Sequence, residues 1–98
     1  APGPRTPRGL LLSASPNPTT HQSVFSFKLP AAGSARLELF DVTGRRVRVL
    51  LDETRVAGEH RVKFDGRDDG GMDLRGGLYV ARLQTAAGTA VTRLTIAH

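Results

Sequence analysis

The segment from residue 35 to residue 47 constrains the fold of this chain more than any other. Ala35, Leu37 and Leu39 alternate with Arg36 and Glu38. This period of two is typical of a strand with one buried and one solvent-exposed face. Asp41-Val42-Thr43-Gly44 follows, and its composition predicts a tight turn, because Asp can accept turn N–H groups and Gly tolerates positive φ. Val47, Val49 and Leu50 then predict a returning strand. The segment predicts the centre of a small β-sandwich and contains no residue of catalytic character.

Similar alternation recurs along the rest of the chain. Further strands are predicted over residues 10–15, 23–29, 60–64, 77–83 and 90–97, separated by segments rich in Pro, Gly and Asp. About seven antiparallel strands in two sheets indicate an all-β, immunoglobulin-like β-sandwich. A helix is the weaker alternative, and only residues 47–55 are candidates for it, with a short turn at Asp52-Glu53-Thr54. The expected core consists of Phe25, Phe27, Leu37, Leu39, Val62, Phe64, Tyr79 and Leu83.

The length of 98 residues suits one domain with a two-layer core. Residues 1–9 are rich in Pro and Gly and are interpreted as an extended linker, which leaves residues 10–98 as the domain. The chain has no signal-peptide core, no initiator Met and no apolar run of membrane-spanning length, so we interpret it as a fragment of a larger protein. Because it contains no cysteine, it has no disulfide framework, zinc-thiolate site or Cys nucleophile.

The formal charge of +5 raises the question of nucleic-acid binding. All the basic residues except Lys28 and Lys63 are arginine, which pairs with carboxylates and phosphates bidentately. Binders of single strands also need exposed aromatic rings for base stacking. Only five aromatic residues are present, and four occupy strand positions that a core would use. A solvated, arginine-rich strand face is the preferred interpretation, and no nucleic-acid partner is expected.

Catalytic and metal-binding patterns are sparse. His21, His60 and His98 lie in no recognisable nucleophile motif, and His60 is expected to pack in the sandwich, so we predict no enzyme activity and no cofactor. Four carboxylates, at Asp65, Asp68, Asp69 and Asp73, are the only calcium candidates. Their spacing departs from the EF-hand pattern. The favoured alternative is a turn-rich loop whose Asp residues bind backbone N–H groups and pair with Arg67 and Arg75.

Carbohydrate binding is the main competing function within sandwich folds. Such modules stack sugar rings on exposed aromatic platforms, but this chain has no Trp, and its one Tyr is on an inward-facing position. Phe40, out of phase with Leu37 and Leu39, is the only aromatic residue with an outward-facing position. One Phe is a small platform for a sugar chain.

Five ordered motifs resemble those of one known family: Pro16-Asn17-Pro18, residues 37–47, Gly58-Glu59-His60, residues 64–69 and residues 77–83. The set resembles the type A C-terminal sorting domain of type IX secretion cargo and the related immunoglobulin-like domain of the flagellar hook-capping protein. Phe64 stands where the hook-capping type usually has Trp, and no Lys-rich tail follows Ile96. The chain ends with its last predicted strand, which favours the sorting domain.

The resemblance implies a non-catalytic C-terminal signal of a larger secreted protein, an expected hydrolase of polysaccharide or protein. The partners would be the type IX secretion machinery, its surface peptidase and the preceding domains of the same chain. The location would be outside the cell or on the outer surface of a Gram-negative, Bacteroidota-like bacterium. The alternative is an accessory structural or carbohydrate-binding module of a glycoside hydrolase. The signal residues that the resemblance implies are Pro16, Asn17, Pro18, Asp41, Gly44, Arg45, Gly77, Tyr79, Arg82, Arg93, Leu94 and Ile96.

Overall fold

A computed structural model of the chain describes residues 9–97 and contains seven antiparallel strands in two sheets, so the predicted β-sandwich is confirmed. The strands, in chain order, are β1 (Leu11–Ser15), β2 (Ser23–Leu29), β3 (Gly33–Asp41), β4 (Arg46–Arg55), β5 (Gly58–Phe64), β6 (Gly77–Thr85) and β7 (Gly88–Ile96).

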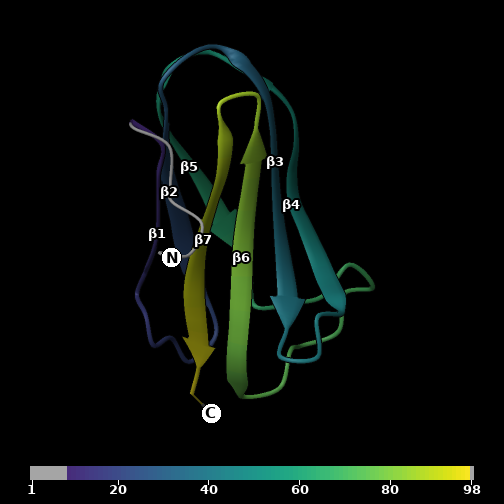
Figure 1. The fold of residues 1–98 in the computed structure, drawn as a ribbon. Helices are drawn as coiled ribbons and strands as arrows, with labels where there is room; N and C mark the ends of the chain where they lie inside the picture. Colours follow the sequence, from purple (N-terminus) through teal and green to yellow (C-terminus); the bar gives the residue numbers. More distant parts are fainter. Residues whose placement is uncertain (1–8, 98) are drawn as a thin grey trace, which may run out of the picture.

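The two sheets differ in size. One has the order β1-β2-β5, and the other has the order β4-β3-β6-β7. Because β2 and β3, β4 and β5, and β5 and β6 are consecutive in the chain but belong to different sheets, the connections cross between layers, as in immunoglobulin-like folds. Figure 1 shows the four-stranded sheet in front of the three-stranded one. The loop after β1, the turn after β3, the start of β6 and the end of β7 all lie at the lower end of this view.

The core lies between the inward faces of the two sheets. Seven of the eight residues predicted for it are buried, and Val62 is partly buried against them. Phe25 and Phe64 lie on adjacent strands with ring centroids 6.0 Å apart. Leu10, Leu94 and Ile96 belong to the same buried cluster, so the last strand is an integral part of the core. Burial of this kind supplies the main driving force for folding.

Two sequence expectations about the central hairpin are wrong. β4 continues as a strand to Arg55, so the short turn proposed at residues 52–54 does not form; these residues pair in register with residues 34–36 of β3. The alternation also predicts a solvent-exposed Glu38. Its side chain lies on the outer face, as the pattern predicts, but it is almost fully buried because three arginine side chains cover it. Two β-bulges interrupt the β3–β4 pairing, next to Glu38 and next to Phe40.

Within residues 9–97 we find no helix that is long and apolar enough to cross a membrane.

Candidate functional site

The Pro16-Asn17-Pro18 turn lies against the free edge of the last strand, β7. Neither proline has an N–H group to donate, so the side chain of Asn17 supplies the hydrogen bonds instead. Asn17 Nδ2 donates to the Arg93 carbonyl at 2.7 Å, and the Thr95 N–H donates to Asn17 Oδ1 at 3.0 Å. The carboxamide therefore mimics the donor and acceptor of a neighbouring strand.

Thr19 continues this pairing toward the end of β7. Its N–H donates to the Thr95 carbonyl at 2.9 Å, and its carbonyl accepts the Ala97 N–H at 2.7 Å, which makes a short parallel bridge. We call the pairing of residues 17 and 19 with residues 93–97 the β7 clamp. Ser23 Oγ supports it by donating to the Pro16 carbonyl at 3.0 Å. The clamp covers backbone groups that an open sheet edge would leave available for pairing with another chain.

The turn between β3 and β4 is organised by Asp41. Its Oδ1 accepts the Thr43 N–H at 2.9 Å, the Thr43 hydroxyl at 2.6 Å and the Arg45 N–H at 3.1 Å. These hydrogen bonds, led by that of the Thr43 side chain, hold the pKa of Asp41 below its ordinary value. Gly44 has φ of +85°, which L side chains rarely adopt. The side chain of Arg45 is exposed beside this turn.

Tyr79 lies near the start of β6, two residues after Gly77. Its ring is buried, and its hydroxyl donates to the Arg75 carbonyl at 2.7 Å, four residues upstream. Burial and the nearby charge of Asp41 raise the pKa of Tyr79. This arrangement is the tyrosine corner of immunoglobulin-like sandwiches, and it ties the loop before β6 to the core.

Glu38 is the centre of a charge cluster on the outer face of the four-stranded sheet. Arg46 Nη1 lies 3.1 Å from Glu38 Oε2, Arg82 Nη2 lies 3.3 Å from Oε1, and Arg36 Nε lies 3.5 Å from Oε2. Burial alone would raise the pKa of Glu38, but hydrogen bonds from Arg46 and Arg82 and the charge of Arg36 outweigh it and lower that pKa. Sequence reasoning missed this residue, although Arg36 in the same strand and Arg46 at the start of the next one were a visible signal.

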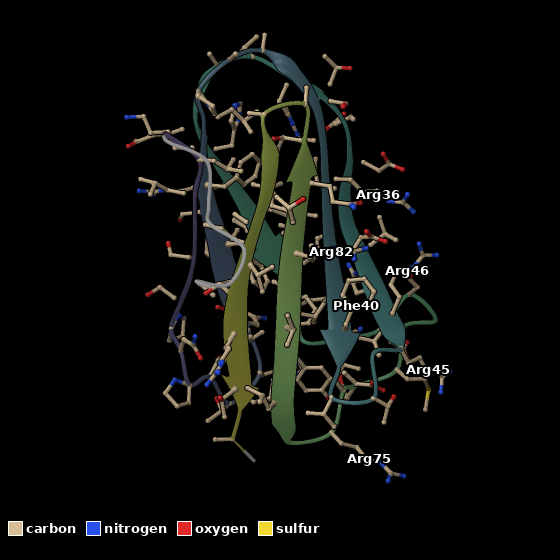
Figure 2. The ribbon with its side chains drawn as sticks, in the orientation of Figure 1. Arg36, Phe40, Arg45, Arg46, Arg75 and Arg82 are labelled. Atoms are coloured by element: carbon tan, nitrogen blue, oxygen red, sulfur yellow. The ribbon has the colours of Figure 1, made fainter. Side chains whose placement is uncertain are left out.

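Phe40 lies next to this cluster. It is half-buried, and the guanidinium of Arg82 lies 4.7 Å from the centroid of its ring. Figure 2 shows Phe40 among Arg36, Arg46 and Arg82 on the near side of the sheet. Phe40 therefore faces outward, as its position in the strand predicts, but a cation already occupies the space over its ring.

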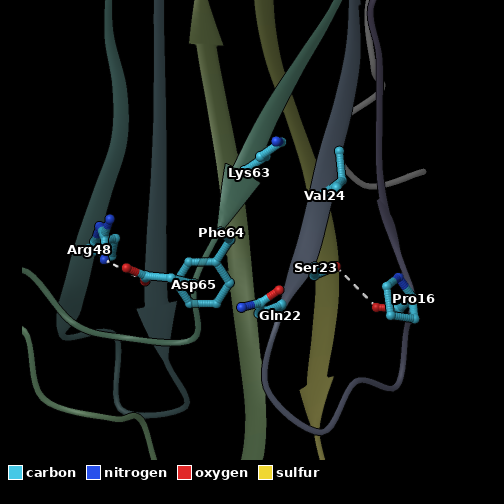
Figure 3. A pocket seen from close by; sticks show the side chains of 8 residues that line it. All are labelled: Pro16, Gln22, Ser23, Val24, Arg48, Lys63, Phe64 and Asp65. Carbon is cyan, nitrogen blue, oxygen red and sulfur yellow. Dashed lines mark hydrogen bonds and ion pairs between the residues drawn. The ribbon is translucent and has the colours of Figure 1, made fainter.

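A cleft of about 570 Å³ opens at the lower end of the sandwich, on the side of β4 and β5. Figure 3 shows its lining, with Phe64 between Arg48 and the Pro16 loop. Arg48 Nη1 forms an ion pair with Asp65 Oδ1 at 3.0 Å, and the Ser23 hydroxyl donates a hydrogen bond to the Pro16 carbonyl. Among residues 9–97, no histidine lines this cleft.

The four carboxylates of the loop after β5 all have partners within the protein. Asp68 Oδ1 accepts the N–H groups of Gly70 and Met72, both at 2.9 Å, and Asp69 Oδ1 accepts the Val49 N–H at 3.1 Å. Arg48 pairs with Asp65, and Arg67 pairs with Asp73 at 3.3 Å. Arg75, the other predicted partner, contributes its backbone carbonyl to Tyr79 instead. Among residues 9–97 no three His, Asp or Glu side chains gather in a way that could hold a metal ion.

The structure brings most of the signal residues that the sequence resemblance implies to the lower end of the sandwich or to β7. Leu94 and Ile96 are buried in the core, whereas Arg93 is exposed and offers its carbonyl to the β7 clamp. Arg82 is apart from these, on the outer sheet face. His60, as expected, packs within the sandwich: it stacks on Phe27 at 5.2 Å, and its Nε2 lies 2.8 Å from the Val56 carbonyl. His98 lies outside the described residues.

The strand order and the tyrosine corner define an immunoglobulin-like β-sandwich. No protein-family model matches the chain, and no curated protein matches it significantly. Among solved structures, it is similar to dimeric latent PorU from Porphyromonas gingivalis, with a TM-score of 0.71 and 18% identity over 98% of this chain and 10% of PorU. It is also similar to FlgD from P. aeruginosa, with a TM-score of 0.64 and 21% identity over 91% of this chain and 74% of FlgD.

A third similar structure is PorZ from P. gingivalis, described as an essential bacterial surface component of the type IX secretion system. The TM-score is 0.56, with 19% identity over 89% of this chain and 11% of PorZ. The chain thus spans about a tenth of the two type IX proteins. Its fold matches those of both groups of proteins that the sequence resembles, the type IX secretion components and the flagellar hook-capping protein.

Proposed function

We propose that residues 10–98 form a non-catalytic C-terminal sorting domain, which directs a larger secreted protein through a type IX secretion system to the cell surface or the medium. In this proposal residues 1–9 are the linker to a preceding hydrolytic or binding domain. The machinery reads the folded domain, and a surface peptidase acts on the linker.

The β7 clamp is the observation that carries this proposal. The Pro-Asn-Pro motif and the last strand are more than 70 residues apart in the sequence, yet Asn17 bonds directly to Arg93 and Thr95. A signal composed of both motifs would therefore be presented as one surface, and only when the domain is folded. The similarity of fold to segments of PorU and PorZ supports the same function.

The test is export of a reporter. Residues 1–98 are fused to the C-terminus of a fluorescent protein that carries a signal peptide, in a host with a type IX system and in a derivative that lacks the machinery. We expect surface or extracellular fluorescence in the first host and periplasmic fluorescence in the second. Deletion of residues 94–98 removes two buried side chains and should abolish export.

Asn17→Ala is a milder variant that separates signal from folding. It removes two hydrogen bonds, a cost of about 1–2 kcal/mol that should leave the domain folded at growth temperature. We expect a several-fold loss of export, while Thr20→Ala, an exposed neighbour, exports normally. Melting curves of both purified variants verify that they are folded. Export that is independent of the machinery or insensitive to the deletion of residues 94–98 would rule out the sorting function.

The structure offers little support for a carbohydrate-binding module. Phe25, Phe27, Phe64 and Tyr79 are buried, and Phe40 lies beneath Arg82. Sugar-binding platforms require an open aromatic face. We accordingly expect the purified domain not to sediment with insoluble xylan, cellulose or chitin.

A further inference from the structure

The outer face of the four-stranded sheet combines arginines with exposed apolar side chains. We call this surface the arginine face; it comprises Arg36, Arg46, Arg82 and Arg93 together with Phe40, Val42, Val80 and Val91. Cross-strand pairing puts Phe40 next to Val80, Val80 next to Arg93, and Arg82 next to Val91. Figure 2 shows Arg36, Arg46 and Arg82 around Phe40 on this side of the sheet.

Positive charge on this face exceeds negative charge. Two carboxylates accompany the four arginines, namely Glu38 and Asp52, which leaves an excess of two positive charges. Glu38 is already enclosed by three of the arginines, so it cannot neutralise a further guanidinium. Arg36, Arg46 and Arg82 keep side-chain exposures of 43%, 45% and 40%. The Nε atoms of Arg36 and Arg82 are buried, so an anionic partner would contact the exposed parts of the three guanidinium groups.

Glu38 also restricts the motion of the guanidinium groups. One nearly buried carboxylate holds the ends of three long side chains within 3.5 Å of its oxygens. A free arginine loses rotamer entropy when it binds a partner, and that loss weakens binding. Because three of these arginines are already positioned, the face is preorganised to bind carboxylates.

A shallow hollow of about 380 Å³ lies beside the arginines. Phe40, Val80 and Arg82 contribute to its lining, and Val42 and Val91 border it with exposures of 71% and 58%. Apolar side chains left this exposed gain free energy when a partner covers them. The hollow is therefore suited to one apolar side chain from a partner.

We propose that the arginine face is a docking surface for an acidic segment of another protein, whose carboxylates pair with the arginines while an apolar side chain fills the hollow. Charge complementarity identifies the partner. A second copy of this chain bound here would bring two positively charged faces together, which repel each other. A phosphate polymer would leave the apolar hollow unfilled. Docking of an acidic segment goes beyond the sorting function and is tested separately from it, because binding is measured on the purified chain.

The test uses short fluorescein-labelled peptides and fluorescence anisotropy. The first peptide is glutamate-rich with one central leucine, the second has serine in place of leucine, and the third has glutamine in place of glutamate. We expect the first to bind most tightly. Loss of the leucine should weaken binding about tenfold, which is the value of one buried aliphatic side chain. Loss of the glutamates should abolish detectable binding.

A matched pair of double variants locates the binding site. Arg93→Gln with Val91→Ser alters the arginine face, and Arg61→Gln with Val56→Ser alters exposed residues of the same types, of which Val91 is 58% and Val56 69% exposed. We expect at least about a fivefold loss of affinity for the first pair and no change for the second. Equal effects of the two pairs would overturn the proposal. So would self-association of the chain through this face, or polyphosphate binding as tightly as the leucine peptide.

Discussion

At the scale of single residues, glycines allow the backbone conformations and the close contacts of the loops at the lower end of the sandwich. Gly66 is buried with φ of +80°, and a Cβ at this position would lie 2.3 Å from the His21 carbonyl oxygen. The residue thus allows the loop before β2 and the loop after β5 to come into contact. Gly44 and Gly77 also have positive φ, but among residues 9–97 no atom other than those of the glycine and its chain neighbours lies within 4 Å of the position of a Cβ there. For these two glycines the constraint is backbone conformation alone.

Truncation of Phe64 should strongly destabilise the domain. Its side chain is 1% exposed, and it contacts Phe25 and the guanidinium of Arg48. We expect Phe64→Ala to lower the free energy of unfolding by about 3–5 kcal/mol, because both transfer energy and packing around the cavity are lost. Urea unfolding followed by circular dichroism measures this. Met72→Ala, at a side chain 70% exposed, is the control and should change stability by less than about 0.5 kcal/mol. A similar small change for Phe64→Ala would contradict the core described above.

Glu38 should make the stability of the domain sensitive to acid. Its pKa in the folded state is below its ordinary value, so its contribution is present above about pH 4 and is lost as the pH falls through the folded-state pKa. Glu38→Gln should lower stability by about 1–3 kcal/mol at neutral pH, since charge-assisted hydrogen bonds are lost. It should also make the loss of stability below pH 4 shallower.

Thermal melts of Glu38→Gln and the original chain between pH 2 and pH 7 test this expectation. Glu59→Gln, at an exposed position of β5, is the matched control and should follow the original curve. If the curve of the Glu38 variant ran parallel to that of the original chain at all pH values, the arginine cluster would not be responsible for the acid sensitivity.

At the scale of elements, loops cover parts of both edges of the four-stranded sheet. The β7 clamp covers the end of β7, and Asp69 covers part of β4 by accepting the Val49 N–H while its own N–H donates to the Val47 carbonyl at 3.0 Å. In both places a side-chain oxygen and a backbone group take the role of a missing strand. Such cover reduces edge-to-edge association of sheets.

The carboxylates of the loop after β5 already have hydrogen-bond or ion-pair partners in the protein. We therefore predict that millimolar calcium leaves the melting temperature unchanged, because a ligand stabilises a protein only by binding its native state. Asp68→Asn keeps an oxygen that can accept the Gly70 and Met72 N–H groups and is the matched variant. A calcium-dependent rise of several degrees that Asp68→Asn abolishes would identify the loop as a metal site.

At the scale of the whole molecule, the two proposed activities use different surfaces. The β7 clamp lies at the end and edge of the larger sheet, whereas most of the arginine face covers the outward side of β3, β4 and β6 (Figures 1 and 2). Arg93 belongs to both, since its carbonyl bonds to Asn17 and its side chain faces outward. In the proposed sorting function, the secretion machinery could therefore contact β7 while a partner protein occupies the sheet face.

The sequence by itself determined the strands and the core. Period-two alternation in residues 23–29, 35–39 and 77–83 assigns each side chain to one face, and burial of the apolar face follows from local pattern alone. The turn at Asp41 was likewise visible, because an Asp that caps its own turn needs no distant partner. These features depend on neighbours within a few residues.

Only the tertiary structure decided the burial of Glu38, the β7 clamp and the contact of Gly66 with His21. Each depends on segments that are distant in the sequence: Arg82 with Glu38, Asn17 with Arg93 and Thr95, and Gly66 with the His21 carbonyl. An alternating pattern assigns a charged residue to the outer face but does not say which side chains of neighbouring strands will cover it. Strand order and register decide that, and they are set by the packing of the two sheets as a whole.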